Sequence, residues 1–275
     1  MNCKLSGFTF DDPCIRRKED EYRRSKWLYM ERRINCLVRK LNISNIQFVA
    51  HGIMNLQNLI PGRGLFCKAV MKSQSGSPQS SNLYASLVAI VNSRFPDVGL
   101  LLVKRAVLQF KEAYDRNNTK KMRDASTFLA HLVNQTVVYE VLAIDVLLLL
   151  LSDPSSDNIE VSVSFCTECR SFLLDYAPHK LHEIFKEFIS LLRKEGLERR
   201  IRVAVVKLLA VRASRFKRYP TMIGKLDLVD EVGDQVRHVV SLLHDIHPET
   251  GLDDFKPNSE SDNDQCEMFS RMMIN

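Results

Sequence analysis

The segment Ile34–Pro78, INCLVRKLNISNIQFVAHGIMNLQNLIPGRGLFCKAVMKSQSGSP, decides the fold class of this chain. Its first apolar stripe ends at Leu41, where the polar turn Asn-Ile-Ser-Asn at 42–45 follows. A second apolar stripe then runs to the sequence Pro-Gly-Arg-Gly at 61–64, which interrupts it. Apolar residues at helical spacing, separated by turn residues, predict two consecutive helices joined as a hairpin. The segment carries no catalytic motif and is typical of a scaffold.

The helix before this turn has a buried face and a basic face. Its apolar positions recur at steps of three, four and seven, as on one side of an α-helix. These positions are Trp27, Met30, Ile34, Leu37, Val38 and Leu41. Lys26, Arg33 and Lys40 lie seven positions apart on a different line, with Arg32 and Arg39 beside them. Solvated helices commonly carry such basic faces, so the charge pattern alone indicates no partner.

Composition and charge limit the classes of protein to which this chain can belong. With 45% hydrophobic and 26% charged residues, the 275-residue chain can bury a substantial core in one elongated domain or two small ones. Residues 225–275 hold 12 Asp and Glu against 4 Lys and Arg, a net charge of −8, which leaves +14 on residues 1–224. A basic body suits RNA, an acidic partner surface or the chain's own tail, and charge does not choose among them.

Cysteine usage and hydropathy predict an intracellular soluble protein without membrane contact. The seven cysteines are odd in number and show no disulfide-framework spacing, so most should be reduced thiols. The first residues, MNCKLSGFTFDDPC, lack the apolar stretch of a secretory signal. The longest apolar run, Val146–Leu151, is too short to span a bilayer.

Helical periodicity divides the chain into three regions. Residues 1–20 are charged and aperiodic, and we expect a disordered N-terminus. Residues 21–220 form the helical domain, and residues 221–275 form an acidic, mostly irregular tail that is disordered or draped over the body. Asp157 with Glu160 matches a capping box, and Pro178 suits the first turn of a helix. The predicted helices span residues 21–41, 44–59, 64–74, 80–93, 97–116, 120–134, 137–151, 158–175, 179–194 and 197–217.

Ten helices joined by short turns predict an all-α fold. Consecutive helices pair into about five antiparallel hairpins, which stack because no single hairpin buries its own apolar faces. Such an arrangement is an α-α superhelix, a HEAT-like solenoid. The sequence has no clean repeat period, so a compact helical bundle stays open as the alternative.

No constellation in the sequence supports an enzyme. Cys166 and Cys169 lie in a helical pattern without a second pair, whereas a zinc site needs four ligands. His179 and His182 share a helix face but have no third ligand nearby in sequence. Gly-Arg-Gly at 62–64 is too short for a phosphate-binding loop and predicts a turn whose glycines permit unusual dihedral angles. We therefore assign no catalytic, cofactor-binding or metal-binding residue.

Direct RNA binding has weaker support than a scaffold role. Recognition of single strands needs aromatic residues interleaved with basic residues. Only Trp27, with Tyr22 and Tyr29, comes near this pattern, and Trp27 belongs to the apolar stripe. We therefore expect any contact with RNA to be indirect.

The sequences in and around the helix joints resemble those of one protein family. The motifs occur in order and cover residues 25–258. They are VRKLNISNI, GRGLF, LYASLVAIVNSRFPDVG, LLVKRAVLQFKEAYDRNN, FLAHLVNQ, the helix Glu140–Leu151, FCTECRSFL, LDLVDE and DDFKPN. The chain is similar to the middle domain of the nucampholin family, the spliceosome-associated Cwc-twenty-two splicing factors. The fold of that domain is shared with the middle domain of translation initiation factor four-G.

This resemblance implies a five-hairpin helical scaffold, for which we expect no cofactor. We expect the chain to be a monomer, because hairpin stacking buries its apolar faces and leaves no long heptad seam. In the family, the domain binds the DEAD-box helicase of the exon junction complex, which is the initiation-factor-four-A type, isoform three. The helicase is held open and inactive and is brought into the spliceosome, in the nucleus and its speckles. The alternatives are a translation or mRNA-decay scaffold that binds a related DEAD-box helicase, and a direct RNA-binding protein.

The resemblance also implies the residues that bind the helicase. The family's contact pair maps onto Arg39 and Lys40, and the adjoining turn contributes Asn42 and Asn45. Lys40 matches the family's lysine, whereas Arg39 stands where the family has asparagine. After Asn258 the family continues into a second helical module of the MA-three type, and this sequence lacks the module. The resemblance therefore implies none of that module's function here.

Overall fold

The computed structural model describes residues 13–57, 59–194, 196–213, 226–229 and 235–257. Over these residues the chain forms ten α-helices, and its β-structure is a single bridge between Val138 and His238. The helices are α1 (Pro13–Arg39), α2 (Ile46–Met54), α3 (Arg63–Gly76), α4 (Ser81–Arg94), α5 (Pro96–Asp115), α6 (Thr119–Asn134), α7 (Glu140–Ser152), α8 (Ser156–Tyr176), α9 (Pro178–Leu192) and α10 (Arg199–Ala213). The predicted all-α solenoid is confirmed.

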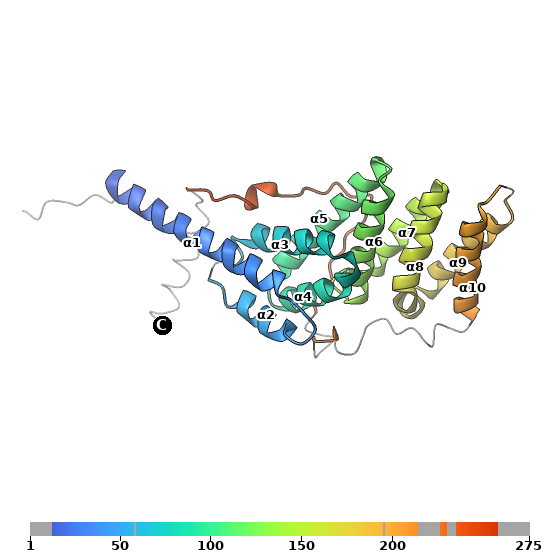
Figure 1. The fold of residues 1–275 in the computed structure, drawn as a ribbon, viewed down its shortest axis with the longest axis horizontal. Coiled ribbons are helices and arrows are strands. Elements are labelled where there is room, and N and C mark those ends of the chain that lie inside the picture. Colours follow the sequence, from blue (N-terminus) through green and yellow to red (C-terminus); the bar gives the residue numbers. More distant parts are fainter. Residues whose placement is uncertain (1–12, 58, 195, 214–225, 230–234, 258–275) are drawn as a thin grey trace, which may run out of the picture.

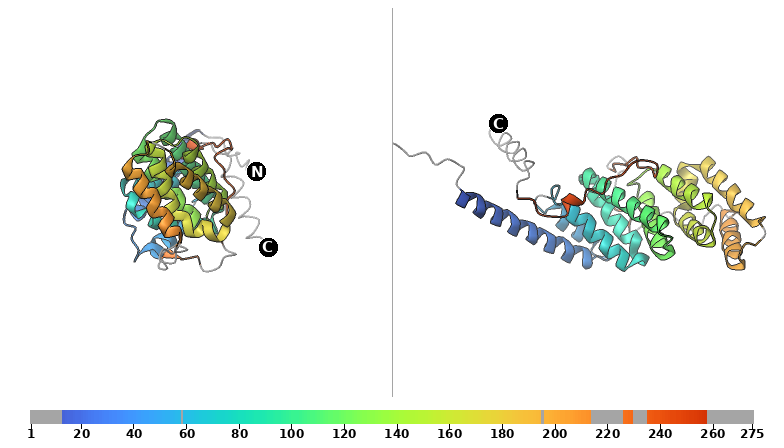
Figure 2. Two further views of the ribbon diagram at one scale, coloured as in Figure 1. Left: turned by 90° about the vertical axis from the view of Figure 1, so that its right-hand side faces the viewer. Right: turned by 90° about the horizontal axis from the view of Figure 1, so that it is seen from above.

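The helices form two layers along an elongated body (Figures 1 and 2). Helices α2, α4, α6, α8 and α10 contact one another in succession. In the second layer α1 contacts α3, α3 contacts α5, and α7 contacts α9. Apolar side chains fill the space between the layers, and the largest fully buried ones are phenylalanines. These are Phe66, Phe110, Phe128, Phe165, Phe185 and Phe188. The core therefore runs the length of the molecule.

Local signals place several of the helix starts. Pro178 is the first residue of α9, as predicted, because proline needs no amide partner there. The predicted capping box at the start of α8 is wrong. The hydroxyl of Ser155 caps this helix, because it accepts a hydrogen bond from the Asn158 amide over 3.2 Å. Asp157 instead accepts a hydrogen bond from the Thr119 hydroxyl of α6 over 2.7 Å.

Helix α1 is longer than predicted. It begins at Pro13, so residues 13–20, which we expected to be disordered, are helical. Pro13 fits the first turn of a helix, and most of the charged residues that follow it have high helix propensity without an apolar stripe. Residues 1–12 of the expected disordered region and residues 214–217 of the last predicted helix lie outside the described residues.

Helix α7 begins three residues later than predicted, at Glu140. Thr136 has a φ of 56°, which ends α6 and redirects the chain. Val137 then accepts a hydrogen bond from the His238 amide over 2.9 Å, and the Tyr139 amide donates to the His238 carbonyl over 3.1 Å. This pairing with a remote segment keeps residues 137–139 extended, against their helical periodicity.

The remote segment, residues 235–257, is called the strap below. Helices α5 and α7 have no pair of Cα atoms within 8 Å of each other, and the strap bridges them (Figure 1). Lys111 of α5 donates to the Leu242 carbonyl over 3.1 Å. Asp145 of α7 accepts from the Ser241 hydroxyl and the Leu242 amide, over 2.6 and 3.2 Å. The strap therefore supplies the link between the third and fourth hairpins.

The strap is irregular apart from one turn of 3-10 helix, Thr250–Leu252. It belongs to the region predicted as an acidic tail, of which residues 221–225, 230–234 and 258–275 lie outside the described residues. The proposed boundaries of that tail and of the helical domain stay predictions.

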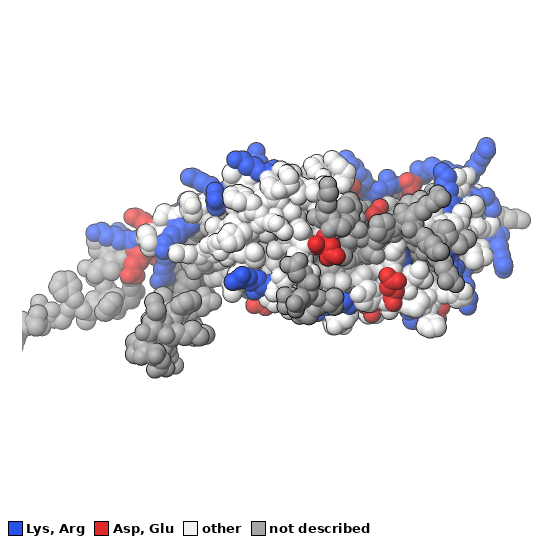
Figure 3. All heavy atoms as spheres, turned by 90° about the horizontal axis from the view of Figure 1, so that it is seen from below, with Lys and Arg blue, Asp and Glu red and all other residues white. Residues whose placement is uncertain are grey.

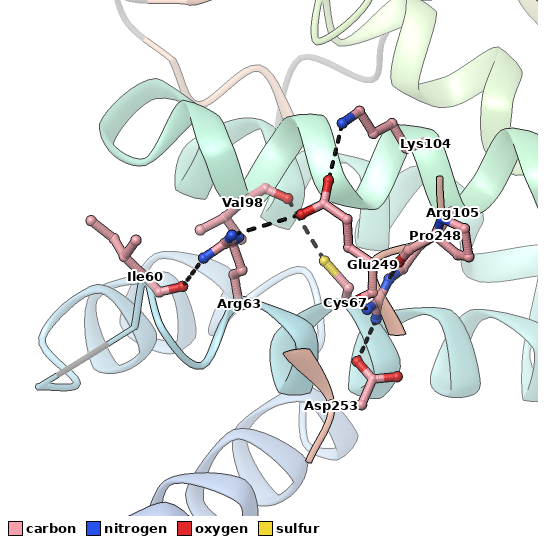
Figure 4. A network of polar contacts seen from close by, with 9 residues as sticks. All are labelled: Ile60, Arg63, Cys67, Val98, Lys104, Arg105, Pro248, Glu249 and Asp253. Atoms are coloured by element: carbon pink, nitrogen blue, oxygen red, sulfur yellow. Dashed lines mark hydrogen bonds and ion pairs between the residues drawn. The ribbon is translucent and has the colours of Figure 1, made fainter. Parts of the chain in front are cut away.

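Arg105 of α5 fastens the strap to the body (Figure 4). Its side chain is only 8% exposed. Its guanidinium donates to the carbonyls of Pro248 and Glu249, over 2.8 and 3.0 Å, and pairs with the Asp253 carboxylate at 2.7 Å. Lys104, one residue earlier, pairs with the Glu249 carboxylate at 3.0 Å. A buried cation is stable only when its donors are satisfied, so the strap completes this part of α5.

Two glycines allow close packing around the strap: Gly64 faces the strap itself, and Gly99 of α5 faces Asn92 of α4, which binds the strap. A Cβ on Gly64 would lie 2.3 Å from the Leu252 carbonyl oxygen of the strap. A Cβ on Gly99 would overlap Asn92, whose side chain donates to the Val236 carbonyl over 2.7 Å. Gly62 has a φ of −84° and Gly64 has no positive φ, so the prediction of unusual dihedral angles at 62–64 is wrong. Close approach of the backbone explains Gly64 instead.

Substitution of Gly64→Ala tests this packing. The added methyl group meets backbone rather than a mobile side chain, so we expect it to lower the free energy of unfolding by about 1–3 kcal/mol. The matched control is Gly76→Ala, because a Cβ at Gly76 meets nothing within 4 Å. Thermal unfolding measured by circular dichroism compares the two. Equal melting temperatures would contradict tight packing of the strap on α3.

Candidate protein-binding site

The four residues predicted to bind a partner lie together at the turn between α1 and α2. Asn42 Oδ1 accepts hydrogen bonds from the Ser44 amide, the Ser44 hydroxyl and the Asn45 amide, over 3.0, 2.6 and 3.1 Å. Asn45 Oδ1 accepts from the Asn42 amide over 2.8 Å, and its Nδ2 donates to the Lys40 carbonyl over 2.8 Å. Short polar side chains often close turns through such local bonds. The network fixes the backbone of Lys40 at the corner.

This geometry separates two roles within the predicted set. Arg39 and Lys40 are exposed and form no ion pair with any described residue, so their charges are available to a partner. Asn42 and Asn45 use much of their hydrogen-bonding capacity on the turn itself. The asparagines therefore position the corner, and the basic pair presents charge. Contact of any of the four with a partner stays a prediction.

The corner also exposes apolar side chains that the sequence reasoning missed. Ile43, at the tip of the turn, is 50% exposed, and Phe48 of α2 is 69% exposed. A shallow hollow of ≈ 950 Å³ lies beside the turn. It is lined by Leu41, Asn42, Ile43, Ser44, Ile46, Gln47, Ser80, Leu83 and Leu228. The available signals were an isoleucine inside a polar turn and a phenylalanine off the buried stripe of α2.

Positive charge lies beside this apolar surface, on α1 and the start of the turn. Residues 32–40 contain four basic residues and no acidic one. In the space-filling view, Lys and Arg side chains gather over α1 at one end of the molecule and over the last two helices at the other end (Figure 3). Apolar side chains rimmed by arginine and lysine are typical of surfaces that bind an acidic partner.

The cysteines and histidines singled out in the sequence do not form a site. Cys166 and Cys169 are both buried, and burial raises the pKa of the Cys166 thiol to about 12. His179 and His182 are exposed, and His182 contacts Arg212 of α10. Within the described part of the chain, no three His, Cys, Asp or Glu residues are grouped as metal ligands would be. None of the helices described there combines the length and apolar character needed to cross a bilayer.

Two histidines belong to the interior of the fold. Burial lowers the pKa of His131 to about 4, so its imidazole is neutral at physiological pH. Burial also lowers the pKa of His238, which lies 2.6 Å from the Asn92 side-chain oxygen and fixes the strap against α4. Both side chains serve packing rather than chemistry.

Comparison with known sequences identifies the domain. Residues 31–215 match the sequence profile of the MIF4G domain, which is about two thirds of the chain. The chain belongs to the MIF4G domain family. The match includes the α1–α2 corner and ends before the strap, although the strap packs on the MIF4G helices.

Named relatives show which proteins with this domain the chain resembles. Proteins named "Pre-mRNA-splicing factor CWC22 homolog" from Mus musculus and Homo sapiens are each 39% identical over 235 residues, which is 86% of this chain and 26% of theirs. "Pre-mRNA-splicing factor cwc22" from Neurospora crassa is 39% identical over 251 residues, 90% of this chain and 25% of its own. The resemblance to the Cwc-twenty-two family is confirmed. This chain spans about a quarter of the length of these relatives.

Replacement of Asn42→Ala tests the structural role of the turn. It leaves the amide and the hydroxyl of Ser44 without their acceptor and removes one of the two acceptors of the Asn45 amide, so the free energy of unfolding should fall by about 1–2 kcal/mol. Gln47→Ala is the control, because Gln47 is exposed on the same hollow and makes no side-chain hydrogen bond to a described residue. Urea unfolding measures both variants. A loss no larger than that of the control would show that the network adds nothing to stability.

Proposed function

We propose that this MIF4G domain is a non-enzymatic scaffold of pre-mRNA splicing. In this proposal it binds the DEAD-box helicase of the exon junction complex, of the initiation-factor-four-A type, isoform three. It holds the helicase open and inactive and recruits it to the spliceosome in the nucleus. The observation that carries the proposal is the exposed Arg39–Lys40 pair, fixed at a rigid corner. The names of the CWC22 relatives support the splicing context.

The shape of the domain suits the control of a two-lobed enzyme. The core is continuous along an elongated body, and the strap joins the two halves of one helical layer. A rigid body that binds two lobes at separate points favours the conformation in which the lobes match its spacing. By this means a scaffold without catalytic residues can stabilise an open helicase against a closed one.

Reversal of charge at the corner tests the proposed contact. The double variant Arg39→Asp with Lys40→Glu should weaken binding of the helicase by about 1–3 kcal/mol, because both side chains lie off the buried face of α1. Binding is measured by titration calorimetry with the purified helicase. Unfolding should stay cooperative, because no core contact is lost.

The matched control reverses charge elsewhere. Lys120→Glu with Lys121→Asp alters two exposed lysines in the first turn of α6, where acidic residues suit the helix dipole. This variant should bind the helicase like the unchanged protein. Equal weakening by both variants would mean that net charge rather than the corner determines affinity, and unchanged binding by the corner variant would remove the proposed contact.

The mode of action is tested by ATP turnover. If the domain prefers the open helicase, its addition should suppress the RNA-stimulated ATPase and lower the apparent affinity of the helicase for RNA and ATP together, by linkage. The measurement is the steady-state rate at saturating RNA as the domain is titrated. Stimulation would instead favour the second candidate, a translation or mRNA-decay scaffold that speeds the cycle of a related helicase.

A further inference from the structure

One face of α1 carries a continuous row of exposed side chains. The row consists of Tyr22, Lys26, Tyr29, Arg33 and Cys36 of α1, continued by Lys40, the first residue after the helix ends at Arg39, and all six are exposed. Their spacing alternates between four and three residues, which places them on one line of an α-helix. At 1.5 Å per residue the row is about 27 Å long. It is called the tyrosine row below.

The two tyrosines are not used by the core. Tyr22 is 60% exposed and Tyr29 is 65% exposed. Trp27, the aromatic residue between them, turns to the other side, where its ring lies 6.3 Å from that of Phe255 in the strap. Lys26 lies in the row itself, with its Nζ 4.5 Å from the centroid of the Tyr22 ring. Aromatic and basic groups therefore alternate on one solvent-exposed line.

No described residue neutralises the charge along this line. Residues 22–40 contain seven basic residues and a single acidic one, Glu31. Lys26, Arg33 and Lys40 form no ion pair with any described residue. An extended row of free cations attracts a polyanion, and exposed aromatic rings between the cations offer stacking surfaces to bases.

We propose that the tyrosine row binds single-stranded RNA. Lys26, Arg33 and Lys40 contact phosphates, and the rings of Tyr22 and Tyr29 stack with bases. An acidic protein segment would satisfy the charges but would give the two exposed rings no stacking partner, so RNA is the better match. From the sequence we expected only indirect RNA contact, because Trp27 belongs to the apolar stripe; the exposure of both Tyr22 and Tyr29 is the observation that favours direct binding. This RNA binding is additional to the proposed helicase binding, and the two proposed sites share Lys40.

Fluorescence anisotropy with a labelled oligouridine of about 12 nucleotides tests the proposal on the full chain without helicase. Tyr22→Ala with Tyr29→Ala should weaken binding at least about tenfold, since stacking on each ring contributes appreciably. Tyr22→Phe with Tyr29→Phe should retain binding, because the ring faces are kept. Tyr22→Leu with Tyr29→Leu should lose it like the alanine pair, because an apolar side chain without a ring cannot stack.

A matched control removes charge without touching the row. Lys68→Ala with Lys72→Ala alters two exposed lysines of α3 and should leave RNA affinity within about twofold. Circular dichroism confirms that every variant is folded. Leucine variants that bind RNA as well as the phenylalanine variants would overturn the proposal, and so would equal weakening by the α3 control. Tyrosine-dependent binding of polyglutamate without binding of RNA would assign the row to an acidic protein partner and would also overturn it.

Discussion

The guanidinium of Arg105 joins three parts of the chain that are far apart in sequence. It lies on α5, donates to the Gly64 carbonyl of α3 over 3.3 Å, and binds two carbonyls and one carboxylate of the strap. A charge buried to this extent is tolerated because almost every donor has an acceptor, and loss of one partner from such a group commonly costs about 3–5 kcal/mol. The position of the strap follows from this requirement, and with it the link between α5 and α7.

The proposed helicase corner depends on this arrangement more than its place in the sequence suggests. The turn at 42–45 is closed locally by its two asparagines, but the hollow beside it is completed by Leu228, from the far end of the chain. Trp27 of α1 contacts Phe255 of the strap. The orientation of α1, which carries both the basic corner and the tyrosine row, is therefore set by both ends of the domain.

Periodicity in the sequence was sufficient to place all ten helices and to separate the buried face of α1 from its basic face. It failed where distant segments interact. Residues 137–139 are extended because they pair with His238, and Gly64 is needed because Leu252 approaches it. At the corner, the exposure of Arg39 and Lys40 followed from the stripe. The exposure of Ile43 did not, since an apolar residue in a turn has no periodic position, and Phe48 is exposed because it lies off the buried stripe of α2. A local sequence pattern does not show which segment from elsewhere in the chain will pack against it.

The strap also determines the order in which this domain can be completed. The hydrogen bond between Asn92 and Val236 joins residues 144 positions apart. During synthesis all ten helices leave the ribosome before the strap, so α5 and α7 first exist without the segment that bridges them, and Arg105 first exists without its carboxylate. Contacts that close such long loops form late and slowly compared with hairpins. The nascent solenoid therefore passes through a stage in which the strap-binding groups of α5 and α7, such as Arg105, Lys111 and Asp145, are open to water and to other chains, until the final residues of the strap are synthesised.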